Sequence, residues 1–337
     1  MLHLQLLKKM NLLFLVINLV SIQAGPTCRS LSLEGGGSHG AYEAGVISAL
    51  ASLTNPGDIA WNAVSGISVG AINVGALIQF PTGQETQAAS YLVNLWKSLN
   101  SSSDIYKEWE GGLAAGLLFH SGVYSTEPLQ KLLRTDLTKP PARNFTVGAT
   151  NLDTGLFSTF DETVGNGVID AIMCSAAPPF AFPPHQFEGY TWADGACVMN
   201  LDVASGIERC LQITEEENII TDLIFDSPYA GLANETSFKT RDVLTRMYHI
   251  LSYDSSIWFT YNAQRAFPKV FFRYIIHPSG PLPGGNIPLN FTPAVIDYEI
   301  QLGINDTTNY LKSSKPGRVI IEELYSSLKS QTIYPNP

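Results

Sequence analysis

The chain has 337 residues, of which 45% are hydrophobic and 15% are charged, and its formal net charge is −10 at pH 7. This composition is typical of a globular protein and excludes an intrinsically disordered chain. The acidic balance also argues against a nucleic-acid partner, because no basic stripe along the sequence would neutralise phosphates.

The first 24 residues have the pattern of a secretory signal peptide. Lys8 and Lys9 precede a short apolar run that ends at Ala24, the expected cleavage point, and an uncleaved signal anchor is the alternative. We therefore expect a protein that is secreted or held in the lumen of the secretory pathway. Five N-x-S/T sequons also predict a glycoprotein; they begin at Asn100, Asn144, Asn234, Asn290 and Asn305.

Four cysteines follow the signal peptide: Cys28, Cys174, Cys197 and Cys210. In an oxidising compartment they allow two disulfides in three pairings, of which we favour Cys197 with Cys210, while free buried thiols are the alternative. No pair or cluster of cysteines and histidines has metal-ligand spacing, so we expect no metal.

The chain after the signal peptide begins with two strand–turn–helix units. Residues 29–34 and 60–66 are strand-like, and the apolar runs at 40–53 and 69–80 are helical, the second stopped by Pro81. Repeated strand–helix order is typical of a parallel sheet.

Further strands are expected at 144–152, 216–227 and 269–277, and helices at 235–267, 292–306 and 318–331. We interpret the whole as one α/β domain: residues 25–205 form the catalytic core, and 206–337 continue the same domain with a helical C-terminal portion. The Gly-rich apolar run at 109–120 predicts a buried helix or, alternatively, a mobile flap that meets a lipid surface.

Gly35, Gly37 and Gly40 spell G-x-G-x-x-G between the first strand and the first helix. This pattern is typical of dinucleotide binding, but it equally offers bare amides to the oxyanion of an ester under attack. A dinucleotide site needs an acidic residue about 20 positions on, at the end of the second strand. Asp58 precedes that strand instead, so a nucleotide-dependent oxidoreductase has only the glycines in its favour.

Gly66, Ser68 and Gly70 form G-x-S-x-G at the second strand-to-helix junction. Such a nucleophile elbow holds a serine on a strained turn above a sheet, and its glycines permit a close crossing of strand and helix. A plain Gly/Ser packing turn is the alternative. In the elbow interpretation, the amides of Gly35, Gly36, Gly37 and Val69 point at the oxyanion.

A serine needs a neighbouring base. The six histidines are scattered, whereas Asp194 and Gly195 close an aromatic, strand-like run at the predicted mouth of the sheet. A partly desolvated carboxylate there would accept the serine proton, although an ordinary Asp-Gly turn is the alternative.

Three blocks in order resemble the patatin-like phospholipases: "LSLEGGGSHGAYEAGVI", "AVSGISVGAINVGAL" and "CSAAPPFAFPPHQFEGYTWADGACVMN". The resemblance implies a three-layer α/β/α fold with helices on both faces of a mostly parallel sheet. It also implies a Ser–Asp dyad, which assigns Ser68 as nucleophile and Asp194 as proton acceptor, with Gly35, Gly36 and Gly37 as the oxyanion loop. The expected substrate is a lipid acyl ester, taken up through transient contact with a membrane or micelle, and no metal or cofactor is implied.

The chain departs from this family at His39, where an arginine or lysine is usual. We expect activity to rise in mildly acidic solution if a charged His39 replaces that cation, and simple packing of His39 is the alternative. Two other functions compete. One is an α/β-hydrolase with His249 or His277 as base, and the other is a secreted lipid-binding or storage protein without catalysis.

Overall fold

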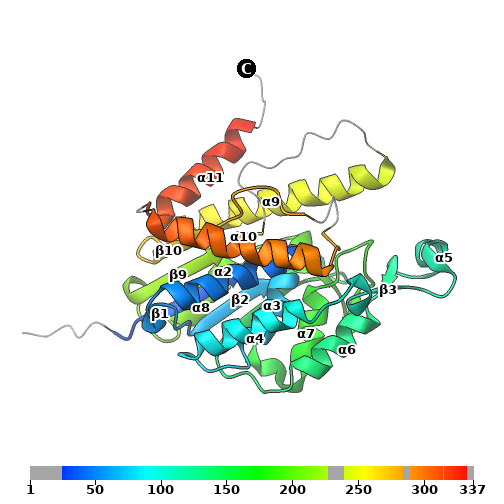
Figure 1. The fold of residues 1–337 in the computed structure, drawn as a ribbon, viewed down its shortest axis with the longest axis horizontal. Helices are drawn as coiled ribbons and strands as arrows, with labels where there is room; N and C mark the ends of the chain where they lie inside the picture. The colour runs from blue at the N-terminus through cyan, green and yellow to red at the C-terminus, as the bar shows by residue number, and fades with distance from the viewer. Residues whose placement is uncertain (1–24, 227–238, 284–287, 314, 332–337) are drawn as a thin grey trace, which may run out of the picture.

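The computed structural model describes residues 25–226, 239–283, 288–313 and 315–331 (Figure 1). The predicted signal peptide and the sequon at Asn234 lie outside the described residues. Within them, every helix is too short or too polar to cross a membrane.

One sheet organises the molecule. Its strands are β1 (Cys28–Leu33), β2 (Ala63–Ile67), β5 (Asn144–Asn151), β6 (Phe157–Phe160), β7 (His185–Phe187), β8 (Tyr190–Asp194), β9 (Ile219–Ile224) and β10 (Phe271–Ile276). They lie in the order β10-β9-β1-β2-β5-β8-β7, with β6 also paired to β5. Strands β10 to β5 in this order are all parallel, and β6, β7 and β8 join antiparallel, so the predicted mostly parallel sheet is confirmed.

Helices cover both faces of this sheet. The helices of the described residues are α2 (Gly40–Leu53), α3 (Val69–Leu77), α4 (Glu85–Lys97), α5 (Gly112–Phe119), α6 (Glu127–Asp136), α7 (Val168–Ser175), α8 (Val203–Leu211), α9 (Thr240–Ala266), α10 (Pro293–Lys312) and α11 (Gly317–Gln331). One hydrophobic core lies under α2, α3, α4 and α10, and a second lies under α8, α9 and α11. The three-layer arrangement expected from the sequence is therefore present.

The alternation of residues in β1 decides which core lies on which face. Leu31 and Leu33 enter the core under α2, while Ser30 and Ser32 point at α8. A Cβ on Gly206 of α8 would lie 3.3 Å from both serines, so the small residues on both sides let the helix lie directly on the sheet.

Residues 107–125 form an arm that projects from the body at one end of the molecule (Figure 1). The short strands β3 (Lys107–Glu108) and β4 (Tyr124–Ser125) pair at its base, and α5 forms its tip. The expectation of a buried helix at 109–120 is wrong, because Gly116 is the one buried residue of α5.

A disulfide joins Cys28, at the start of β1, to Cys210, near the end of α8. Their Cα atoms lie 5.5 Å apart, whereas Cys174 and Cys197 are free thiols. The predicted pairing of Cys197 with Cys210 is wrong. Spacing along the chain suggested it, but α8 crosses the sheet and brings Cys210 over the first strand, away from the turn that carries Cys197.

This disulfide closes a loop of 182 residues, so it should restrict the unfolded chain strongly. We expect Cys28→Ala/Cys210→Ala to lower the free energy of unfolding by about 2–5 kcal/mol in non-reducing urea titrations. Cys197→Ala is the matched control and should stay within about 0.5 kcal/mol of the parent. Equal midpoints for the parent and the double variant would contradict the assignment.

Candidate active site

Ser68 lies on a sharp turn between β2 and α3, with φ of 53° and ψ of −119°. The crossing is too tight for side chains on either side. A Cβ on Gly66 would lie 2.4 Å from the Gly70 carbonyl group, and one on Gly70 would lie 2.6 Å from the Leu33 carbonyl oxygen. A positive φ at a residue with a Cβ is strained, and the packed glycine crossing holds it.

Ser175, at the end of α7, braces this turn. Its hydroxyl accepts the Ser68 N–H at 2.8 Å and donates to the Gly148 carbonyl of β5 at 2.6 Å. The bridge ties the turn to the neighbouring strand in a fully buried place. Ser175 was not predicted from the sequence, since no local pattern marks a serine at the end of a helix as a partner of a distant turn.

Strand register brings Asp194 to Ser68. Ile67 pairs with Gly148 in β5, and the next residue, Ala149, pairs with Asp194 in β8. Ser68 and Asp194 therefore lie at the same end of the sheet, with β5 between their strands. Gly195 has to be glycine here, because a Cβ would lie 2.6 Å from the Gly148 carbonyl oxygen.

The Asp194 carboxyl group is completely buried, and Ser68 is only 7% exposed. One carboxyl oxygen, Oδ1, accepts the Ala196 N–H at 2.9 Å. The other, Oδ2, has no partner at full hydrogen-bond geometry among the described residues, yet the Ser68 hydroxyl lies close enough to interact with the carboxylate. Burial raises the pKa of Asp194 to about 7, although the Ser68 hydroxyl and the Ala196 amide both lower it. Such a carboxyl group can accept and return a proton near neutral pH.

The glycine loop follows β1 and closes over the serine. A Cβ on Gly35 would lie 3.0 Å from the Ser68 Cβ, and one on Gly37, where φ is +58°, would lie 2.1 Å from the Pro288 carbonyl oxygen. The loop therefore approaches the nucleophile by its backbone alone. Gly40 likewise has no room, because Val69 Cγ2 would lie 2.3 Å from its Cβ.

The loop amides are not equivalent. Gly35 donates its N–H to the Asn200 carbonyl at 3.0 Å, and the Asn200 side chain donates back to the Gly35 carbonyl at 2.9 Å. The expectation that Gly35 supplies an oxyanion amide is therefore wrong for this conformation. Within the described chain, the amides of Gly36, Gly37 and Val69 have no backbone acceptor, so these three are free for an anion. Val69 also begins α3, whose dipole favours negative charge there.

His39 does not replace a cation. Burial lowers its pKa to about 3, and the nearby His249 lowers it further, although a bond to the Pro283 carbonyl at 3.2 Å opposes the shift. The imidazole is therefore neutral in mildly acidic solution, which removes the reason for the expected gain of activity on acidification. His39 instead packs at the start of α2, as the alternative expectation held.

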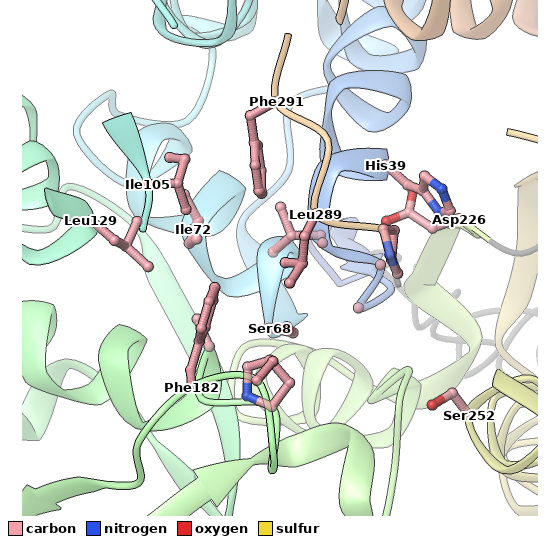
Figure 2. Close-up of a pocket in the computed structure, with 18 of the residues that line it drawn as sticks. His39, Ser68, Ile72, Ile105, Leu129, Phe182, Asp226, Ser252, Leu289 and Phe291 are labelled. Atoms are coloured by element: carbon pink, nitrogen blue, oxygen red, sulfur yellow. The ribbon is translucent and has the colours of Figure 1, made fainter. Parts of the chain in front are cut away.

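Ser68 opens into a pocket of about 400 Å³, within the range of small-ligand sites. Its walls are mainly apolar, with side chains from α3, α6 and the loops between elements (Figure 2). The labelled apolar side chains are Ile72, Ile105, Leu129, Phe182, Leu289 and Phe291. His249 on α9 also lines the pocket, whereas His277 is not among the described lining residues. In the described chain, no three His, Cys, Asp or Glu side chains are placed to hold a metal ion.

A family model described as patatin-like phospholipase matches residues 31–207, more than half of the chain. Among solved structures, VipD from Legionella pneumophila is similar, with 14% identity and a TM-score of 0.39, over 86% of this chain and 67% of that one. The type III effector protein ExoU is similar at 12% identity and a TM-score of 0.38, over 91% of this chain and 60% of that one. The search of curated proteins found no match.

The Ser175 brace gives a direct test of how the turn is held. We expect Ser175→Ala to cost about 1–3 kcal/mol of unfolding free energy, because it leaves the Ser68 amide and the Gly148 carbonyl buried without this partner. Urea titration measures the loss. Ser98→Ala, at an exposed serine with one local bond, is the control and should change little. A Ser175→Ala protein as stable as the Ser98→Ala protein would refute the brace.

Proposed function

The chain belongs to the patatin-like phospholipase family, and we propose that it is a serine lipid acyl hydrolase that acts through Ser68 and Asp194. The observation that carries the proposal is a strained serine that lines an apolar pocket and lies beside a buried carboxyl group of pKa about 7. A fatty-acyl chain suits such walls, and its ester would lie beside the serine.

In the proposed reaction, the Ser68 hydroxyl oxygen attacks the ester carbonyl while its proton passes to Asp194. The carbonyl oxygen becomes an oxyanion, which the amides of Gly36, Gly37 and Val69 stabilise. As the tetrahedral intermediate collapses, the ester C–O bond breaks, and Asp194 returns the proton to the leaving alcohol. Water then attacks the acyl-enzyme, Asp194 takes its proton, and the fatty acid leaves with Ser68 restored.

The competing functions are less well supported. His277 does not line the pocket, and among the described residues the side chain whose interaction lowers the pKa of the Asp194 carboxyl group is that of Ser68, whereas His249 lies near His39. A binding or storage role needs neither the strained serine nor the buried acid. A dinucleotide site is disfavoured because the Gly35 amide already donates to the Asn200 carbonyl; we call this pair of hydrogen bonds between Asn200 and Gly35 the Asn200 clamp.

We also propose that the protein travels through the secretory pathway after loss of residues 1–24. The Cys28–Cys210 disulfide supports an oxidising compartment. Asn100 and Asn305 are the exposed sequon residues in the described chain and are the sites that we expect to carry glycans.

We expect Ser68→Ala and Asp194→Asn each to lower the rate of fatty-acid release by about 10⁴-fold or more, because the nucleophile and its base act as a unit. The assay uses the mature protein with phospholipids, galactolipids and neutral glycerides, and circular dichroism checks folding. His277→Ala is the control and should keep full activity. An active Asp194→Asn protein would reject the dyad, and a loss with His249→Ala alone would favour the histidine triad.

The pKa of about 7 at Asp194 sets the expected pH dependence. The base form is the deprotonated one, so kcat/KM for a water-soluble ester should rise from pH 5 and level off above pH 8, with roughly a tenth of the plateau at pH 6. Cys197 and Tyr248 also face Asp194, but burial and then the Asp194 charge raise the pKa of both, so they stay neutral through this range. A rate that rises as pH falls from 7 to 5 would contradict the assignment.

A further inference from the structure

The arm at residues 107–125 carries a set of large apolar side chains that contact solvent. Leu118 is 73% exposed and Phe119 is 80% exposed, and Leu113 and Leu117 are also exposed. Helix α5 has no charged residue from Gly112 to Phe119. A folded monomer gains nothing in water from holding such a helix away from its core, so this tip indicates a contact with something apolar.

Specific contacts inside the arm hold this exposed helix in place. Trp109 donates its ring N–H to the Gly122 carbonyl at 3.0 Å, and the His120 ring stacks on Trp109 at 3.9 Å between centroids. Gly116 packs against the returning segment of the arm, where a Cβ would lie 2.3 Å from the Val123 carbonyl oxygen. Because Trp109, His120 and Gly116 make these contacts inside the arm, the leucines of α5 lie on its other side and contact solvent.

The base of the arm lies at the mouth of the Ser68 pocket. Phe180 and Met247 both line the pocket and are 45% and 53% exposed, so the pocket reaches the surface beside them. The Val123 N–H donates to the Phe180 carbonyl at 2.9 Å, and the Tyr124 N–H donates to the Ala181 carbonyl at 3.0 Å. The arm is thus joined by backbone hydrogen bonds to the segment that forms one side of the mouth.

We propose that the arm inserts Leu113, Leu117, Leu118 and Phe119 into the surface of an electrically neutral, zwitterionic lipid bilayer, and so places the pocket mouth at the lipid. The proposal rests on the lipid acyl hydrolase function proposed above. The net charge of −10 and the absence of a cation from α5 disfavour an anionic membrane. An eight-residue helix is about 12 Å long, too small for the ~800 Å² per partner of a stable dimer, which disfavours a second copy of the chain as occupant.

The test separates membrane contact from catalysis. Vesicles of phosphatidylcholine are mixed with the Ser68→Ala protein, which cannot release products, and bound protein is measured by flotation. We expect Leu118→Asp/Phe119→Asp in this background to lower the partition coefficient by at least about tenfold, because two charges replace two large apolar side chains. Leu53→Asp is the matched control, at an exposed leucine at the end of α2 away from the pocket, and should bind like its parent.

The same arm substitutions in the active protein complete the test. Hydrolysis of a short-chain ester dissolved as monomers should be unchanged, while hydrolysis of vesicle lipid should fall by about the same factor as binding. Undiminished vesicle binding by the arm variant, or no binding by either protein, would overturn the proposal. A change of oligomeric state with the arm substitutions, without a change in vesicle binding, would overturn it in favour of a second copy. If the wild type hydrolyses no ester at all, the proposed function fails. The flotation result still decides whether the arm binds the vesicle surface.

Discussion

The close crossing of β1, β2 and α3 is the constraint on which the candidate site depends. The Leu33 carbonyl group at the end of β1 leaves no room for a Cβ on Gly70, and the Gly70 carbonyl group leaves none for a Cβ on Gly66. Ser68, between these glycines, must turn to a positive φ, which points its side chain out of the sheet. The same crossing starts α3 at Val69, so a helix N-terminus and the glycine loop meet at one point beside the serine hydroxyl.

A second physical feature is that several carboxyl groups near the site are buried and form no salt bridge within the described residues. Burial raises the pKa of Asp194 to about 7, which suits a base that must also give its proton back. Behind the glycine loop, burial raises the pKa of Glu43 and Asp226 well above the ordinary value and that of Glu299 to about 10. The Asp226 charge adds to the shifts of Glu43 and Glu299, and the Glu34 charge adds to those of Glu43 and Asp226. These shifts favour the neutral forms of the three carboxyl groups, which would reduce their repulsion of an oxyanion on the loop amides. In the proposed reaction, a neutral His39 beside them would leave stabilisation of the oxyanion to the backbone.

Features coded by local sequence were predictable. The Gly66–Ser68–Gly70 elbow and the Asp194–Gly195 turn are short motifs whose glycines serve nearby backbone, and the first strand and helix follow from residue periodicity. Features that depend on distant partners were not. The disulfide of Cys28, the Ser175 brace and the Asn200 clamp on Gly35 each join segments far apart in the chain. The environment of His39 was equally hidden, because burial rather than its neighbours in the sequence sets its pKa.

Covalent labelling can show whether Ser68 is the attacking group. The folded protein is treated with a long-chain alkyl fluorophosphonate, which reacts with activated serines, and the adduct is located by peptide mass spectrometry. We expect one adduct per chain, on Ser68, formed faster at pH 8 than at pH 6 as Asp194 loses its proton. An adduct on a different serine, or ester hydrolysis by a protein whose Ser68 stays unlabelled, would contradict it.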